Sequence, residues 1–162
     1  MGKKRVSLLE TTILKVMLPM FHRKIPLIIL LFLYATANAQ KPKAFPVKLP
    51  ASFIDDYGIK YTLDDSLFFQ LPSSKYHILR WNTAEQYIIT RNSYDNPSDK
   101  GLYTRIDYLK LENMEPFRWG FCLSNWNAKT DSLAEFTPVN VDRTNPKKGC
   151  NGFPFSRMKL IE

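Results

Sequence analysis

Apolar and polar residues alternate along several short stretches of this chain, which is the pattern of β-strands that bury one face. The sharpest alternation runs through residues 117–123, where four large apolar side chains point to one face and Cys122 points to the other. We expect the apolar face of this stretch to lie in the core. Similar patterns bounded by turn residues predict further strands at residues 57–63, 66–71, 76–81, 86–91, 102–111 and 157–161.

The clearest hairpin joins residues 76–81 to residues 86–91. A loop made of the intervening residues 82–85 places Leu79 opposite Ile88, and the next apolar pair then falls on the other face of the hairpin. Apolar pairs on both faces are typical of strands that are covered on each side. We therefore expect a second layer to pack over this hairpin.

Residues 130–136 hold the only helix candidate in the pattern, because Ser132 and Glu135 have the spacing of a capping box. About six or seven short strands with at most one short helix predict an all-β, mainly antiparallel fold. The pattern is compatible with a small β-barrel or with a β-sandwich, and it does not choose between them.

The strand at 102–111 carries the most informative polar residues. Ile106 shares one face with Tyr108, while Arg105 and Asp107 share the other. Charges in a core are costly unless they are paired, so we interpret these two as an ion pair that faces a partly apolar interior. Two roles remain open for them: a polar anchor at the floor of a binding cavity, or a purely structural pair, buried or on a solvated outer face.

Tyr103, Arg105, Asp107 and Trp126 are the candidate ligand-binding residues. Tyr103 lies on the same strand face as the charged pair. Trp126 lies in a predicted loop between two asparagines and has no evident partner in the core, so its ring is placed to stack on a sugar or on a protein surface.

The N-terminal region has the pattern of a secretory signal peptide. The apolar run at residues 25–34 follows the basic residues 22–24 and precedes the small-residue motif at 37–39. A membrane span needs about 20 apolar residues, and this run is too short. We expect cleavage after Ala39, and Met20 is an alternative start that gives a signal peptide of ordinary length.

This interpretation divides the chain into three parts. Residues 1–39 form the signal peptide, residues 40–51 form an extended proline-rich arm, and residues 52–162 form one β-rich domain. The expected location is secreted or periplasmic, with no stable membrane anchor after cleavage. The leader holds six of the 23 basic residues and one of the 15 acidic residues, so most of the net charge of +8 belongs to it. The remaining charge is too mild to indicate a nucleic-acid partner.

Cys122 and Cys150 are the only cysteines of the chain. In an exported protein, two cysteines predict a disulfide. Cys122 alternates away from the aromatic face of its strand, so we expect the bond to lie outside the aromatic core. The rival interpretation, a nucleophilic Cys122 with His77 as its base, requires an unpaired Cys150.

The sequence predicts no cofactor and no metal site. His77 is the only histidine after the leader, which excludes a histidine-pair zinc site, and no serine-hydrolase elbow or phosphate-binding glycine loop is present. The run 101–158 carries no motif of a family with known activity. The predicted architecture resembles the calycin-type secreted β-barrels in shape alone, without a lipocalin motif, and shape says little about function.

We therefore expect a secreted or periplasmic, non-enzymatic binding module for a small molecule or a glycan. One alternative is a small secreted hydrolase that uses carboxylates and His77. Another is a protein-interaction or inhibitor domain that acts through exposed loops at 92–101 and 124–130. The pattern favours a non-enzymatic function but leaves the question open.

Overall fold

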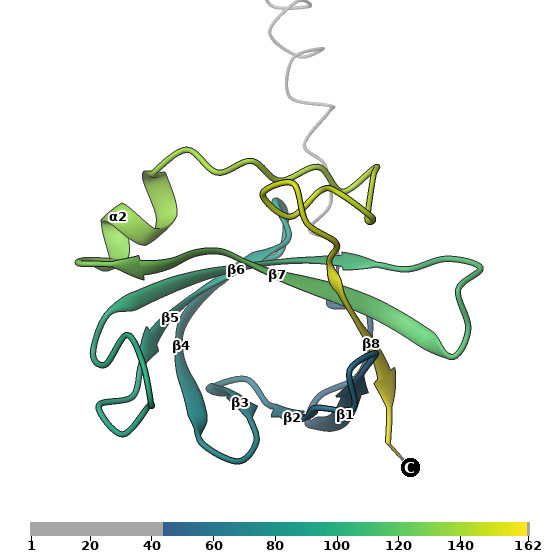
Figure 1. The fold of residues 1–162 in the computed structure, drawn as a ribbon, viewed down its shortest axis with the longest axis horizontal. Coiled ribbons are helices and arrows are strands. Elements are labelled where there is room, and N and C mark those ends of the chain that lie inside the picture. Colours follow the sequence, from purple (N-terminus) through teal and green to yellow (C-terminus); the bar gives the residue numbers. More distant parts are fainter. Residues whose placement is uncertain (1–43, 162) are drawn as a thin grey trace, which may run out of the picture. The chain divides into compact units, whose positions relative to one another are not determined.

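A computed structural model describes residues 44–161 of the chain. Eight strands, each antiparallel to its neighbours, close into a barrel in which the last strand pairs with the first. Figure 1 shows them as a ring. The strands are β1 (Ala51–Asp55), β2 (Lys60–Leu63), β3 (Leu67–Gln70), β4 (Ser74–Asn82), β5 (Tyr87–Asn92), β6 (Tyr103–Lys110), β7 (Phe117–Ala128) and β8 (Ser156–Leu160).

The predicted all-β class is confirmed, and the strands form a closed barrel, not a sandwich. The eight strands exceed the expected number by one or two because β1 was interpreted as the end of an arm and the start of the domain. The predicted signal peptide, and the part of the arm before residue 44, lie outside the described residues.

β1 forms because it has a partner on each edge. It pairs with β2 on one side and with β8 on the other, and this second pairing closes the barrel. The turn after it is organised by the Asp55 carboxylate, which accepts hydrogen bonds from the backbone N–H groups of Tyr57 and Ile59, each over 2.9 Å. Gly58 supplies the positive φ of 86° that this turn requires. β2 therefore begins at Lys60, three residues later than expected.

The predicted hairpin exists as β4 and β5, but its register differs from the expected one. Ile88 pairs with Trp81, and Leu79 lies at a bulge where the register shifts. The loop is displaced by one residue because Gln86 adopts a left-handed φ of 59° and belongs to the turn. Both faces of β5 are nonetheless buried, as the apolar pairs on both faces indicated.

Aromatic and aliphatic side chains fill the barrel interior. Trp119, Phe121 and Leu123 of β7 lie there, as predicted, and Phe121 meets neighbouring rings at the edge-to-face angles that aromatic pairs favour. Phe117 does not, because the register of β7 shifts between Phe117 and Trp119, and Phe117 packs instead against the outer cluster that holds Cys122. Side chains from residues 45, 47 and 49, in the segment before β1, pack against the same cluster. The fully enclosed members of this inner cluster are Phe53, Tyr61, Leu63, Phe68, Ile88, Ile106, Tyr108, Trp119, Phe121 and Met158.

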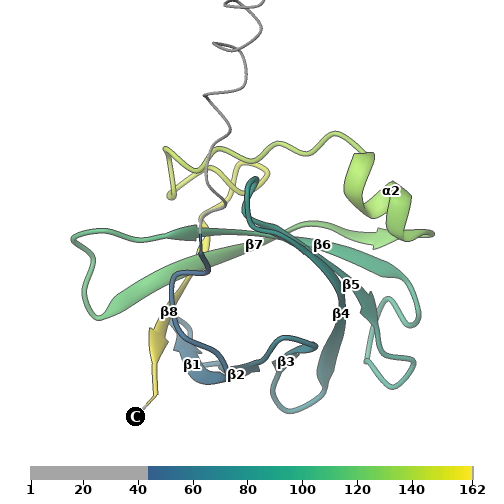
Figure 2. The ribbon, with the colours of Figure 1, turned by 180° about the vertical axis from the view of Figure 1, so that it is seen from behind.

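A second layer covers the outer face of β5, β6 and β7. It consists of helix α2 (Asp131–Phe136) and the irregular segment 137–155, which lie over one side of the ring in Figures 1 and 2. The helix begins at Thr130, whose hydroxyl accepts a hydrogen bond from the backbone of Leu133, so the expected capping box at Ser132 is not used. The predicted disulfide joins Cys122 to Cys150 and ties this layer to β7, outside the inner cluster.

Candidate functional site

Arg105 and Asp107, two of the predicted ligand-binding residues, form an ion pair on β6. Arg105 Nε lies 2.8 Å from Asp107 Oδ2, and Arg105 Nη2 lies 3.1 Å from Asp107 Oδ1. The pair is buried, as one of the open interpretations had it, but it does not face the barrel interior, because Ile106 and Tyr108 occupy the interior face of this strand. Aromatic and aliphatic groups fill that space at far lower cost than charges. The pair therefore lies on the outer face, in contact with α2 and the segment that follows it.

Arg143, which no sequence pattern singled out, completes the surroundings of Asp107. Its Nη2 pairs with Asp107 Oδ1 and donates to the carbonyl of Glu85 over 2.7 Å, while its Nε donates to the carbonyl of Tyr108 over 3.0 Å. The hydroxyl of Ser124 donates to the other oxygen of Asp107. Because Asp107 is fully buried, these donors supply the compensation that its charge requires.

A second charged group holds α2 against the barrel. Arg80 on β4 donates to Asp131 and to Glu135 over 3.0 Å, and the hydroxyl of Tyr87 donates to Glu135 over 2.8 Å. The hydrogen bond from Arg80, followed by that from Tyr87, holds the pKa of Glu135 below its ordinary value. The guanidinium of Arg105 lies 3.9 Å from the centre of the Tyr87 ring, which links the two groups into one network. This network fastens the outer layer to the barrel.

Tyr103 and Trp126 contribute differently from the charged pair. Tyr103 is half-buried and packs with the outer cluster beneath α2. Trp126 lies on β7 and not in the predicted loop, because this strand continues to Ala128. Its side chain is 49 % exposed, as expected for a ring without a core partner, and its carbonyl accepts a hydrogen bond from Thr104. The structure thus brings Arg105 and Asp107 together and leaves the Trp126 indole at the surface. A ligand role for these four residues stays a prediction.

A small cavity of about 10 Å³ remains in the barrel interior, room for about one water molecule. Phe45, in the segment before β1, closes it from one side. The centre of its ring lies 5.0 Å from the ring centres of both Tyr108 and Trp119, and 5.4 Å from that of Trp81. The sequence interpretation of an extended arm missed this contact. The cavity is lined by Phe45, Leu63, Phe68, Ile88, Ile106, Tyr108 and Trp119.

Two of the residues that line this cavity carry a polar atom that is buried without a hydrogen-bond partner: Tyr108 Oη and Trp119 Nε1. Their residues are 1 % and 2 % exposed. An unpaired buried polar group costs about 1–3 kcal/mol, so each one needs an explanation. The neighbouring aromatic polar groups are satisfied, since Tyr61 donates to Asp55 and Trp81 donates to a main-chain carbonyl.

The remaining unpaired buried atom among the described residues is Arg91 Nε, which has a different setting. The guanidinium of Arg91 stacks on the rings of Tyr94 and Tyr103 and donates to the Tyr94 hydroxyl, so it lies outside the inner cluster. The two orphaned donors of the barrel interior therefore form a group of their own.

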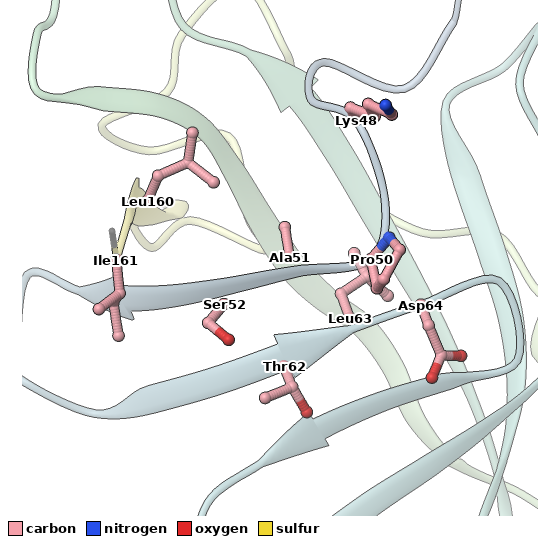
Figure 3. Close-up of a pocket in the computed structure, with 9 residues that line it drawn as sticks. All are labelled: Lys48, Pro50, Ala51, Ser52, Thr62, Leu63, Asp64, Leu160 and Ile161. Atoms are coloured by element: carbon pink, nitrogen blue, oxygen red, sulfur yellow. The ribbon is translucent and has the colours of Figure 1, made fainter.

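A surface hollow of about 540 Å³ lies where the segment before β1 meets β1, β2 and the end of β8 (Figure 3). Its polar side chains reach solvent, which already satisfies them. In this respect the hollow differs from the barrel interior, where two donors lack partners. The residues around it are Lys48, Pro50, Ala51, Ser52, Thr62, Leu63, Asp64, Leu160 and Ile161.

Searches of protein-family models, of curated proteins and of solved structures found no match to this chain. Within residues 44–161, no helix has the length and hydrophobicity of a membrane span. The same part of the chain contains no group of three or more His, Cys, Asp or Glu side chains placed to hold a metal ion.

Proposed function

We propose that this protein is a non-enzymatic binding module that holds a small, mainly apolar molecule inside its barrel. The observation that carries the proposal is that Tyr108 and Trp119, whose side-chain donors are buried without a partner, both line one apolar cavity. Binding sites for small molecules combine an apolar wall with a few fixed polar groups. The interior of an eight-stranded barrel is wide enough for its own side chains or for one small ligand.

The interior favours a small apolar molecule over a glycan. A sugar ring presents hydroxyl groups on all sides, and each needs a partner once it is buried. The inner cluster consists of aromatic and aliphatic side chains, and two donors cannot serve many hydroxyl groups. Trp126 offers an exposed ring for a sugar, but no converging polar groups accompany it.

The polar groups of the outer face favour binding over hydrolysis by carboxylates and His77. A general base must be free to take a proton from its substrate. Both oxygens of Asp107 are occupied by guanidinium and hydroxyl donors, and Asp55 is held by Tyr61 and by the turn after β1. His77 lies exposed on β4.

We also propose that the protein is exported and cleaved after Ala39. The leader pattern supports this, and the disulfide between Cys122 and Cys150 is compatible with an extracellular location. Intact-mass and N-terminal peptide analysis of exported protein should find a chain that begins at Gln40. A mature chain that still contains residues 25–34 would overturn the proposal.

Methyl NMR on the wild-type protein tests the binding site. We expect added acetophenone to shift the methyl resonances of Leu63, Ile88 and Ile106, which line the cavity. The methyl groups of Leu79 and Leu133 are the internal control, because both side chains are exposed. If only these surface resonances move, or if none does with either acetophenone or ethylbenzene, the proposed function is wrong.

A further inference from the structure

We propose that Phe45 occupies the place of the ligand's ring, and that the ligand is an uncharged, ring-containing molecule with a hydrogen-bond acceptor. The segment 44–50 then acts as a plug that the ligand displaces. This inference rests on the proposed function and names its ligand class and its control.

Phe45 is placed so that its ring can leave the barrel interior, unlike the cavity-lining residues that belong to strands. No residue of the segment 44–50 belongs to a strand, so the ring can leave without breaking the ladder of the barrel. Its contacts are edge-to-face packing with three rings, one of them Trp119. Such contacts, and the burial of the ring, are interactions that another ring of similar size reproduces.

A phenyl ring has no atom that could accept a hydrogen bond from Tyr108 or Trp119, which line the same cavity. The indole N–H of Trp119 can only donate, and it has no acceptor within reach. Burial raises the pKa of Tyr108, so its hydroxyl keeps its proton and also donates. An acceptor oxygen on a ligand in this place would satisfy Tyr108 or Trp119, which the Phe45 ring cannot do.

The residues that line the cavity indicate that the ligand is uncharged. The described residues that line the cavity include no lysine, arginine or histidine. A carboxylate or ammonium group would therefore lose its hydration without gaining a counter-ion. Withdrawal of the Phe45 ring opens a space of the size of an aromatic ring, and an apolar protein cavity of about 150 Å³ is known to hold benzene. A neutral aromatic ketone or ester fits these requirements.

Calorimetric titration compares acetophenone with ethylbenzene, which has nearly the same shape but no oxygen. The proteins are the wild type, Phe45→Ala and Val47→Ala. Val47 is the matched control, because it lies in the same segment and packs against the inner cluster but does not line the cavity. We expect Phe45→Ala to bind acetophenone about tenfold more tightly than the wild type, because the Phe45 ring no longer competes with the ligand for the same space. We expect Val47→Ala to bind acetophenone as the wild type does.

The acceptor is tested by the indole N–H resonances of the wild-type protein, so this part does not depend on the folding of a variant. Acetophenone should move the Trp119 indole resonance downfield as its N–H gains an acceptor, while ethylbenzene should not produce that shift. The exposed Trp126 indole should stay in place. In Tyr108→Phe, the preference for acetophenone over ethylbenzene should shrink.

The outcomes separate the two proposals. If the wild type binds acetophenone at the cavity but Phe45→Ala binds it no more tightly than Val47→Ala does, Phe45 does not act as a plug. The proposed binding function would still stand. If acetophenone and ethylbenzene bind equally well and neither moves the Trp119 indole resonance, the inference that the ligand carries a hydrogen-bond acceptor is wrong. If the wild type binds neither probe at the cavity, the proposed function itself fails.

Discussion

Replacing Asp107 by asparagine tests whether the buried charge network holds the outer layer on the barrel. The amide keeps the shape and one acceptor oxygen, but it removes the negative charge that Arg105 and Arg143 share. Breaking a buried ion pair by removing one partner typically costs about 3–5 kcal/mol. The side chains of Arg105 and Arg143 are 13 % and 27 % exposed, so water can partly compensate them. We therefore expect a loss near the lower end, about 3 kcal/mol.

Urea unfolding followed by circular dichroism and tryptophan fluorescence measures this loss directly. For a domain of this size, each kcal/mol lowers the melting temperature by about 4 °C, so Asp107→Asn should melt about 12 °C lower. The control is Glu112→Gln, which removes a carboxylate from an exposed pair with Lys110. Surface pairs of this kind contribute about 0–1 kcal/mol.

Two results would refute the reasoning about Asp107. One is a loss no greater than that of Glu112→Gln, which would mean that the network does not stabilise the fold. The other is strict additivity of Asp107→Asn and Arg143→Ala in the double variant, because residues that share a hydrogen-bond network should show a coupling energy.

Three further predictions concern the outer layer and β7. Arg80 holds the pKa of Glu135 below its ordinary value of 4.5, so this carboxylate stabilises the fold above that pH and loses its contribution as the pH falls through the lowered value. Glu135→Gln should therefore be less stable than the wild type at pH 7 and converge with it in strong acid; a gap in unfolding free energy that is the same at every pH would contradict this. Replacing both Cys122 and Cys150 by alanine should lower the free energy of unfolding by about 3.5 kcal/mol, as expected for the loop that they close, and unchanged urea unfolding would show that the bond does not restrict the unfolded chain. Trp126→Ala should change stability by less than about 0.5 kcal/mol, because the ring is exposed, and unfolding of this variant would place the ring in the core.

The alternation of side chains was sufficient to predict the elements that depend on local pattern. Trp119, Phe121 and Leu123 of β7 lie in the barrel interior, and Cys122 leaves that strand on the other side to meet Cys150. The hairpin of β4 and β5 also follows from its own residues and turn, although its register does not. Local chain geometry fixes which side chains share a face, and a period of two is readable without knowing the partner strands.

The alternation could not decide which face of a doubly covered strand is the interior. On β6, one face carries Ile106 and the other carries Arg105 and Asp107, and both faces are shielded from water. The choice depends on the outer layer, whose Arg143 reaches Asp107 from 36 residues away in the sequence. Two residues that are so far apart in the sequence produce no repeating pattern from which their pairing could be predicted.

The candidate site was determined by the tertiary structure for the same reason. Phe45 lies among prolines in a segment whose composition indicates an extended arm, and its place beside Tyr108 and Trp119 exists only once the barrel has closed. The two donors look like ordinary core aromatics in the sequence. Whether a buried N–H or O–H finds an acceptor depends on distances of a few ångströms between strands, and only the closed barrel sets those distances.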